Sequence, residues 1–125
     1  MNEGLKQFQN QQYLNIETFR KNGAGVKTPV WFAEEDEILF IWTSRESGKV
    51  MRIRRHDRVR IVPCDVGGKP LGQWIDAKAM ADDSPDMIQR VEALFNKKYG
   101  FTFTAYKAIG VLRGGKRTIV ILNLK

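Results

Sequence analysis

The sequence predicts a mainly β protein, a small antiparallel barrel with about two to three short helices. Three observations favour this fold. About seven short segments have the alternating or β-branched character of strands. Turn residues, chiefly Gly, Asn, Asp and Pro, separate these segments at short intervals. The regular strand–helix alternation of a parallel α/β sheet is absent, so an antiparallel barrel or sandwich fits better, and we favour the barrel.

The first part of the chain predicts a short helix and then three strands. Within residues 1–12, two apolar residues spaced by three favour a short N-terminal helix. Strands are expected over 13–19 and 26–32, joined as a hairpin by the turn residues RKNGAG. The segment AEEDE then turns the chain into an apolar strand at 38–43. We expect these three strands to form a meander.

A basic helix is expected over 47–55, with two strands after it. Apolar residues lie three apart in this segment, cations fill the remaining positions, and Ser47 is placed to cap the helix. Residues 58–64 (RVRIVPC) alternate strictly and predict a strand. DVGGKP is a turn, and residues 71–81 predict a further strand.

The clearest helical pattern covers 85–99. Ser84 can cap it, a proline occupies the first helical position, an apolar stripe suits core packing, and Gly100 ends it. Two closing strands, separated by the turn RGGK, are expected over 108–112 and 118–124.

The composition is that of one globular domain, which we expect to span residues 1–125. Apolar residues make up 42% of the chain and charged residues 28%, as in ordinary globular proteins. No repeat or linker divides the chain. Its apolar runs are far shorter than the roughly 20 residues of a membrane-spanning helix, and its N-terminus lacks a secretory signal pattern. We therefore expect a cytoplasmic protein that does not bind membranes.

Few residues are available for metal or nucleophilic chemistry. Cys64 is the only cysteine and His56 the only histidine, which excludes an internal disulfide and a Cys/His metal cluster within one chain. Cys64 lies on an apolar strand, where packing is the commoner role. Asp57 and Asp76 have no partner for acid–base chemistry and fit turn or surface positions. We expect no metal, and we identify no catalytic residue.

The chain carries a formal net charge of +7, which favours anionic partners. The segment 47–60 (SGKVMRIRRHDRVR) concentrates Lys and Arg and admits three interpretations: a nucleic-acid surface, a solvated helix face, or a site for one small anion. Proteins that bind single strands add exposed aromatic residues for base stacking. The basic helix contains no aromatic residue, so we expect no nucleic-acid partner.

Hydroxyl groups, a glycine and a lysine gather at the start of this helix and favour the small anion. Thr43 and Ser47 supply hydroxyls, and Gly48 permits a close backbone approach. Free N–H groups at a helix N-terminus attract phosphate, and we expect Thr43, Lys49 and Arg52 to converge on one. Neither a P-loop nor a GxGxxG motif occurs. The later arginines of the segment are either solvated or face an anionic extension of the ligand.

The residues from about Tyr13 to the C-terminus resemble one known family. Four segments occur in order: TPVWF, the WT at the end of the following strand, GKVMRIRR, and PCDVGGKPLG. This order is similar to that in the split-barrel flavin-binding family related to pyridoxamine-phosphate oxidase, especially its deazaflavin-dependent branch. The resemblance implies a Greek-key-like split β-barrel that forms a homodimer. It also implies a cofactor, FMN or an 8-hydroxy-5-deazaflavin coenzyme, at the dimer interface.

The same resemblance assigns cofactor-binding residues. The match to TPVWF places five residues beside the ring and ribityl chain: Lys27, Thr28, Pro29, Val30 and Trp31. The match to the WT pair adds Trp42 to the cofactor-binding residues, and the matches to that pair and the basic helix give the residues that would hold the phosphate: Thr43, Ser47, Lys49 and Arg52. Gln73 matches a position where related oxidases set a Gln against the cofactor. Lys27 stands where those oxidases place an Arg, whose bidentate hydrogen bonding a Lys does not reproduce.

The resemblance implies an oxidoreductase that transfers a hydride between the cofactor and a small conjugated substrate. A flavin carries the hydride chemistry itself, so the lack of an acid–base pair does not argue against an enzyme. Pyridoxamine-phosphate oxidases continue past the position of VILNLK, so we do not expect vitamin B6 oxidation. The alternative is a non-catalytic protein that binds a flavin or another anionic ligand for storage, delivery or sensing. Both functions need the same phosphate site, and the sequence does not separate them.

Overall fold

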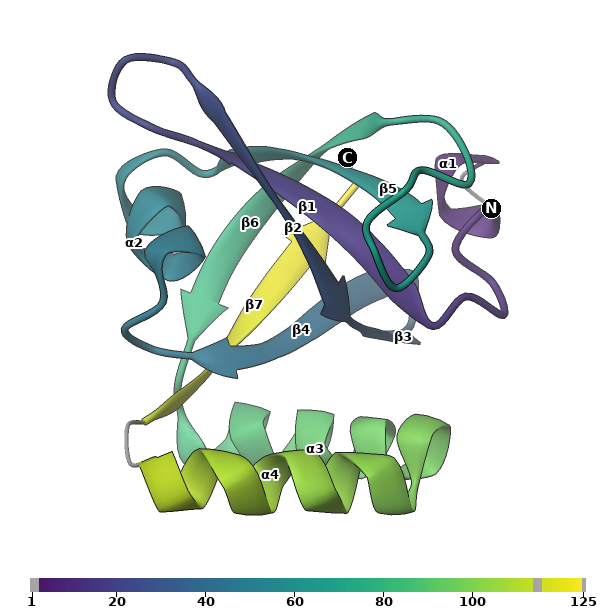
Figure 1. Ribbon diagram of the computed structural model, residues 1–125, viewed down its shortest axis with the longest axis vertical. Coiled ribbons are helices and arrows are strands. Elements are labelled where there is room, and N and C mark those ends of the chain that lie inside the picture. Colours follow the sequence, from purple (N-terminus) through teal and green to yellow (C-terminus); the bar gives the residue numbers. More distant parts are fainter. Residues whose placement is uncertain (1–2, 114–115, 125) are drawn as a thin grey trace.

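One curled sheet dominates the structure, a computed structural model that describes residues 3–113 and 116–124. Within these residues the chain forms seven strands and four helices (Figure 1). In chain order the elements are α1 (Glu3–Lys6), β1 (Tyr13–Phe19), β2 (Gly25–Trp31), β3 (Ala33–Glu35), β4 (Ile38–Ser44), α2 (Gly48–Arg55), β5 (Arg58–Cys64), β6 (Ile75–Asp82), α3 (Pro85–Tyr99), α4 (Phe101–Arg113) and β7 (Arg117–Asn123).

The strands are antiparallel throughout and follow the order β2-β1-β5-β6-β7-β4-β3. The sheet curls on itself (Figure 1), so that the edge strand β2 comes into contact with β4 without pairing to it. A barrel that is hydrogen-bonded around most of its circumference but unpaired along one line is a split barrel. The predicted mainly β, split-barrel fold is confirmed. We call the line along which β2 faces β4 the seam.

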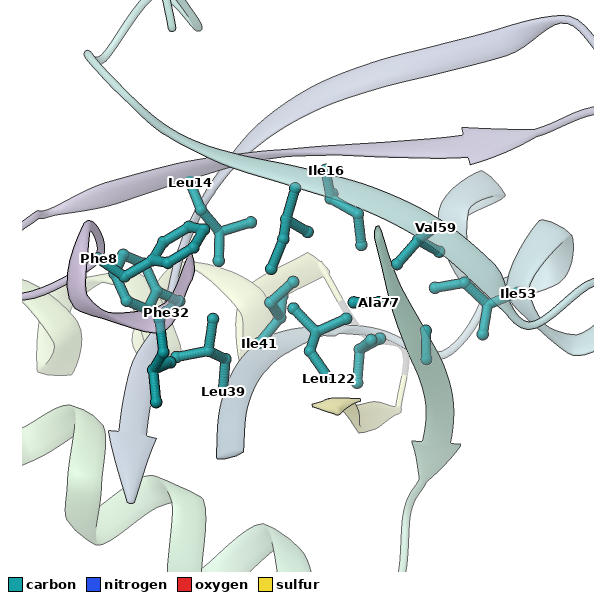
Figure 2. Close-up of a cluster of buried hydrophobic side chains, with 14 of the residues drawn as sticks. Phe8, Leu14, Ile16, Phe32, Leu39, Ile41, Ile53, Val59, Ala77 and Leu122 are labelled. Carbon is teal, nitrogen blue, oxygen red and sulfur yellow. The ribbon is translucent and has the colours of Figure 1, made fainter. Parts of the chain in front are cut away.

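The inner face of the curled sheet holds the main core (Figure 2). Successive side chains of a strand point to opposite faces, and the inward positions of β1 and β4 are apolar. Leu14, Ile16, Leu39 and Ile41 have no exposed surface. The apolar side of the basic helix α2 also packs into this cluster, against β1 and β6. The curled sheet is therefore closed over a continuous apolar interior.

A second apolar cluster lies between the outer face of β4 and the helices α3 and α4, which run side by side (Figure 1). Phe40 and Trp42 of β4 meet Phe95 of α3 and Phe103 of α4 there. The rings of Trp42 and Phe103 contact edge to face, with centroids 5.1 Å apart. Apolar contacts on both faces of β4 explain why its sequence, ILFIW, is continuously apolar instead of alternating.

Local capping signals predicted α2 and α3 correctly. The hydroxyl of Ser47 accepts a hydrogen bond from the backbone N–H of Val50 at 3.4 Å, which caps α2. The hydroxyl of Ser84 accepts one from the N–H of Met87 at 3.4 Å and caps α3. Gly100, with φ of 60°, ends α3 in a conformation that glycine adopts without strain.

The predicted meander of the first three strands is wrong. β1 and β2 form the expected hairpin, but β4 pairs with β3 and β7 instead of β2. The segment AEEDE contains the strand β3 and a turn at Asp36 and Glu37, whose φ angles are 53° and 66°. Two successive positive φ angles are typical of a tight hairpin turn. This turn folds β3 onto β4, so β3 occupies the edge that β2 would need.

The predicted strand over 108–112 is also wrong, because these residues belong to the helix α4. The segment FTFTAYKAIGVLR is rich in β-formers, but tertiary contacts outweigh that preference. Phe103 is fully buried against α3 and β4, and the Lys107 ammonium lies 2.6 Å from the Glu92 carboxylate on α3. The expected RGGK turn falls partly on residues 114–115, outside the described part of the chain.

Two other predicted elements are shorter than expected. The N-terminal helix covers only Glu3–Lys6, and Asn10 adopts a positive φ of 63° that ends any helical run. The strand predicted over 71–81 begins at Ile75, because residues 71–74 form an irregular segment. None of the helices in the described part of the chain combines the length and the apolar character needed to cross a membrane.

Two side chains at the end of α3 fix the chain segment after β2. The Tyr99 hydroxyl accepts a hydrogen bond from the Phe32 N–H at 3.0 Å and lies 2.7 Å from the Gln12 carbonyl oxygen, to which it donates. The Lys98 ammonium donates to the Phe32 carbonyl oxygen at 2.8 Å. Burial lowers the pKa of Lys98 to about 8, and the nearby carboxylate of Glu34 offsets this only in part.

The lowered pKa of Lys98 predicts a specific dependence of stability on pH. Between about pH 8 and pH 10.5 the folded protein has lost this proton while the unfolded chain keeps it, so the free energy of unfolding rises with pH. Lys98→Met removes the titrating group. We therefore expect the free energy of unfolding of Lys98→Met, measured by urea denaturation, to fall relative to that of the wild type as the pH rises through this window. Lys97→Met, at the exposed neighbouring position, is the control, and an equal trend in both variants would contradict the assignment.

Candidate functional site

A cavity of about 420 Å³ opens at the seam. Its walls come from both strands that flank the seam, from the start of α2, and from the helix pair α3 and α4. We call it the seam cleft. The lining residues are Tyr13, Thr28, Pro29, Val30, Trp31, Trp42, Thr43, Lys49, Val66, Phe95 and Tyr106. A volume of this size is within the range of small-molecule and cofactor sites.

One wall of the seam cleft is the free edge of β2. This strand pairs only with β1, so its other edge offers unpaired backbone groups to the cleft. Pro29 lies in the strand, as prolines do at sheet edges because they lack an N–H to donate. Trp31 at the strand end stacks on Tyr99, with centroids 4.4 Å apart and planes 9° from parallel. Tyr106 of α4 is next to the same indole, at 5.5 Å. Flat aromatic surfaces and backbone hydrogen-bonding groups thus meet at this wall.

The opposite wall comes from the end of β4. Trp42 is only 7% exposed, and its indole Nε1 has no hydrogen-bond partner in the described part of the chain. Thr43 is also buried, and across the strand pair lies Thr118, whose hydroxyl likewise lacks a partner there. Buried polar groups are nearly always hydrogen-bonded. Trp42 therefore lines the cleft, while its indole N–H stays buried and unsatisfied and is not presented to the cavity.

Lys49, in the first turn of α2, makes one end of the seam cleft cationic. Burial lowers the pKa of Lys49, and the nearby guanidinium of Arg52 lowers it further. Among the described residues, Lys49 takes part in no ion pair. An anion bound beside Lys49 would supply a negative charge and would favour the protonated form.

The structure brings most of the predicted cofactor residues to the seam cleft, but it places four of them elsewhere. Those in the cleft are Thr28, Pro29, Val30, Trp31, Trp42, Thr43 and Lys49. Ser47 lies just outside, with its hydroxyl engaged in capping α2. The Arg52 Nε donates to the Thr18 hydroxyl at 2.7 Å, and Arg52 does not line the cleft.

Lys27 and Gln73 lie on another side of the β1–β2 hairpin. The Lys27 ammonium is above the ring of Trp74, 5.1 Å from its centroid. The backbone N–H of Gln73 donates to the Gln7 side chain at 2.8 Å, and the Gln73 carbonyl oxygen accepts from the same amide. Neither residue lines the seam cleft.

Four lining residues are not among those that the sequence predicts: Tyr13, Val66, Phe95 and Tyr106. Tyr106 lies on α4, a helix that the sequence does not predict. Val66 belongs to the DVGGKP turn, for which the sequence predicts no contact with the ligand. Hydrogen bonds fix the conformation of the DVGGKP turn. The Asp65 carboxylate accepts hydrogen bonds from the backbone N–H groups of Gly67 and Lys69 at 3.0 and 2.9 Å. The Asn15 amide also donates to the Gly68 carbonyl oxygen at 2.9 Å, so Val66 is presented to the cleft by a fixed loop.

Cys64 is a packed residue, as the sequence predicted. It is 2% exposed, and burial, with a further contribution from the Asp65 carboxylate, raises the pKa of its thiol to about 11. A thiol with a raised pKa is a poor nucleophile near neutral pH. In residues 3–113 and 116–124, no group of three or more His, Cys, Asp or Glu side chains is placed to hold a metal ion.

Comparison with known proteins identifies the fold. No protein-family model and no curated protein sequence matches the chain. Among solved structures, the heme storage protein HutZ from Vibrio cholerae has a TM-score of 0.72 at 13% sequence identity, over 96% of this chain and 86% of that one. A putative pyridoxamine 5'-phosphate oxidase from Listeria innocua has a TM-score of 0.65 at 13% identity, over 94% and 87%. A protein described as F420 reductase has a TM-score of 0.63 at 14% identity, over 100% and 95%.

These similarities show that the chain has the split-barrel fold of proteins like pyridoxamine-phosphate oxidase. The resemblance that the sequence motifs suggested is confirmed at that level. The three proteins differ in the function their descriptions give, so the fold alone does not choose among those functions.

Proposed function

We propose that this protein is an oxidoreductase that binds FMN or an 8-hydroxy-5-deazaflavin coenzyme in the seam cleft. The bound cofactor would exchange a hydride with a small conjugated substrate. The observation that carries the proposal is the composition of the cleft: the free edge of β2, the aromatic side chains of Trp31, Trp42 and Tyr106, and Lys49 surround one cavity of about 420 Å³. Descriptions of two structural neighbours, an F420 reductase and a putative pyridoxamine 5'-phosphate oxidase, add support.

The residues of the cleft fit the chemistry of such a cofactor. A flat tricyclic ring suits the walls made by β2, Trp31 and Tyr106, where apolar surface and backbone groups are both available. Trp42 adds the apolar surface of its indole to the cleft wall. Lys49 suits the phosphate, because it lines the cleft and forms no ion pair with any of the described residues.

The chain's own residues would bind and orient the cofactor instead of taking part in covalent chemistry. A bound flavin or deazaflavin supplies the hydride acceptor or donor. The free edge of β2 would fix the position of the cofactor ring in the cleft. The aromatic side chains would exclude water from one face of the ring. Cys64, the one cysteine, is buried with a raised pKa, and the carboxylate side chains do not line the cleft. The proposal therefore assigns no acid, base or nucleophile to this chain.

The alternative is a non-catalytic protein that stores, delivers or senses a bound ligand. One specific observation favours considering it: HutZ, a structural neighbour, is described as a heme storage protein. The single histidine of this chain, His56, does not line the seam cleft. A heme ligated by histidine would not fit the cleft of one chain, so a flavin-like ligand remains the better candidate for storage as well.

Turnover separates the two functions. The cofactor-loaded protein would be mixed with a panel of enones, quinones and tetrapyrroles, and the absorbance of the reduced cofactor would be followed. We expect reoxidation of the bound cofactor by at least one conjugated acceptor, faster than the free cofactor reacts. Tight binding without any acceleration over the free cofactor would support the storage function and would contradict the enzyme.

We also propose that the protein is a homodimer with the seam cleft near its interface. Two cleft residues, Val66 and Tyr106, are 71% and 47% exposed, and Ile109, which follows Tyr106 by three residues on α4, is 52% exposed. Exposed apolar groups beside a cavity are typical of association surfaces. A second copy that covers these side chains would also cover the mouth of the cleft.

Light scattering coupled to gel filtration tests the dimer. We expect a mass of two chains at micromolar concentration, and Ile109→Glu should shift the protein towards one chain by placing a charge in the interface. A wild-type mass of one chain at all concentrations would contradict the proposal.

A further inference from the structure

A second cavity lies apart from the seam cleft and has a different character. Its volume is about 530 Å³, and it is lined by Phe19, Arg20, Lys21, Gly23, Arg55, His56 and Arg58. It shares no residue with the seam cleft. Figure 1 shows its setting, where the turn between β1 and β2 projects beyond the sheet on the side of α2. We call it the basic cavity.

Three chain segments bring cations to this cavity from separate directions. Arg20 and Lys21 come from the β1–β2 turn, Arg55 from the last turn of α2, and Arg58 from the first position of β5. The turn itself is held by two backbone hydrogen bonds, between the Arg20 N–H and Ala24 carbonyl and between the Gly23 N–H and Arg20 carbonyl, each 2.9 Å long. The cations therefore sit on a defined scaffold.

The basic cavity has an excess of positive charge. Its lining, within the described residues, contains no Asp or Glu. In the described part of the chain, none of these four cations takes part in an ion pair. The carbonyl end of α2 carries only about half a negative charge, which four cations outweigh. Like charges held this close repel one another, and a bound anion would remove that repulsion.

Positively charged side chains of α2 also connect the basic cavity with the seam cleft. Arg52 is one helical turn from Lys49 in the cleft and one turn from Arg55 in the cavity. Burial lowers the pKa of Arg52, and the charges of Arg20 and Arg55 lower it further. From Lys49 to Arg55 the helix rises by roughly 9 Å. A second anionic group could be held at this distance from one bound at Lys49.

We propose that the basic cavity is a second anion site, which binds a group with several negative charges, a polyphosphate or a polycarboxylate. The aromatic pair Phe19 and His56, with centroids 6.3 Å apart, forms one of its walls, so the ligand need not be anionic over its whole surface. The polyanion is either a separate small molecule or the extension of the ligand in the seam cleft. Both have the same chemistry and would meet the same arginines.

Calorimetric titration of the full-length protein with tripolyphosphate tests the site. We expect Arg55→Gln and Arg58→Gln each to weaken binding about tenfold or more, because each removes a charge-assisted hydrogen-bond donor. Arg54→Gln is the matched control: it removes the same charge from the adjacent position of α2, but Arg54 does not line the cavity. Its affinity should stay within about twofold of the wild type.

Cofactor titrations of the same variants distinguish the two sources of the polyanion. If the polyanion is a separate molecule, Arg55→Gln leaves the affinity for both FMN and polyglutamylated deazaflavin unchanged, and tripolyphosphate binds the FMN-loaded protein as well as the free protein. If it is an extension of the same ligand, Arg55→Gln weakens only the polyglutamylated cofactor.

Two results would overturn the second anion site. One is tripolyphosphate binding that Arg54→Gln and Arg55→Gln weaken equally, which would reflect the net charge and not a site. The other is the absence of tripolyphosphate binding at low salt. Either result leaves the seam cleft untouched, because neither Arg55 nor Arg58 lines it.

Discussion

Replacing Phe103 by alanine is expected to lower the free energy of unfolding by about 3–5 kcal/mol, the usual range for removing a buried phenylalanine side chain. Phe103 has no exposed surface and packs against Trp42 and Phe95, with ring centroids 5.1 Å away in both cases. The truncation would leave a cavity at the point where α3, α4 and β4 meet. Urea denaturation followed by far-UV circular dichroism measures the effect.

Phe101 provides the matched control for Phe103. It has the same side chain, lies two residues earlier on α4, and is 85% exposed. Phe101→Ala should change the free energy of unfolding by no more than about 0.5 kcal/mol. If the two variants are equally stable, residues 101–113 do not pack on the sheet as this helix does. A strand over 108–112 would then have to be reconsidered.

Lys49→Ala is expected to weaken the binding of FMN or the deazaflavin coenzyme by about 1–3 kcal/mol, or roughly 5- to 150-fold in Kd. Lys49 is the cation that lines the seam cleft, and it takes part in no ion pair in the described part of the chain. Because its burial disfavours the charged form, the variant should fold at least as well as the wild type. Fluorescence titration with each cofactor gives the Kd.

Arg54→Ala is the control for Lys49→Ala. Both variants lose one positive charge from α2, but Arg54 is exposed and lies away from the cleft. Its effect on Kd should be about twofold or less. Equal weakening in the two variants would mean that the phosphate responds to the overall charge of the protein and is not held at Lys49.

The parts of the fold that were predictable from the sequence depend on neighbouring residues. Ser47 and Ser84 cap their helices through hydrogen bonds with backbone N–H groups only three residues later in the sequence. Gly100 ends α3 because glycine adopts a positive φ without strain. The alternation of side chains with the two-residue period of a strand was enough to predict β1 and β5. Such signals are local, so a single sequence contains them.

The parts that were not predictable depend on distant contacts. Helix α4 contains many residues that favour strands, but Phe103 packs between α3 and β4, and this contact stabilises the helix. The partner of β4 depends on a tight turn at Asp36 and Glu37, which lacks the glycine that usually marks such turns. The residues of the site divide in the same way, into those predictable from local motifs and those that depend on distant contacts. The TPVWF and GKVMRIRR motifs placed β2 and Lys49 at the cleft, whereas Tyr106 and Phe95 enter it only through the packing of α3 and α4.

The central claim is that the seam cleft holds a flavin or deazaflavin cofactor, and a direct titration of the wild-type protein with both cofactors tests it. The account predicts that at least one binds with a Kd of about 1 μM or lower, with quenching of tryptophan fluorescence because Trp31 and Trp42 line the cleft. Failure of both cofactors to bind at about 100 μM, in a protein shown to be folded, would contradict the claim.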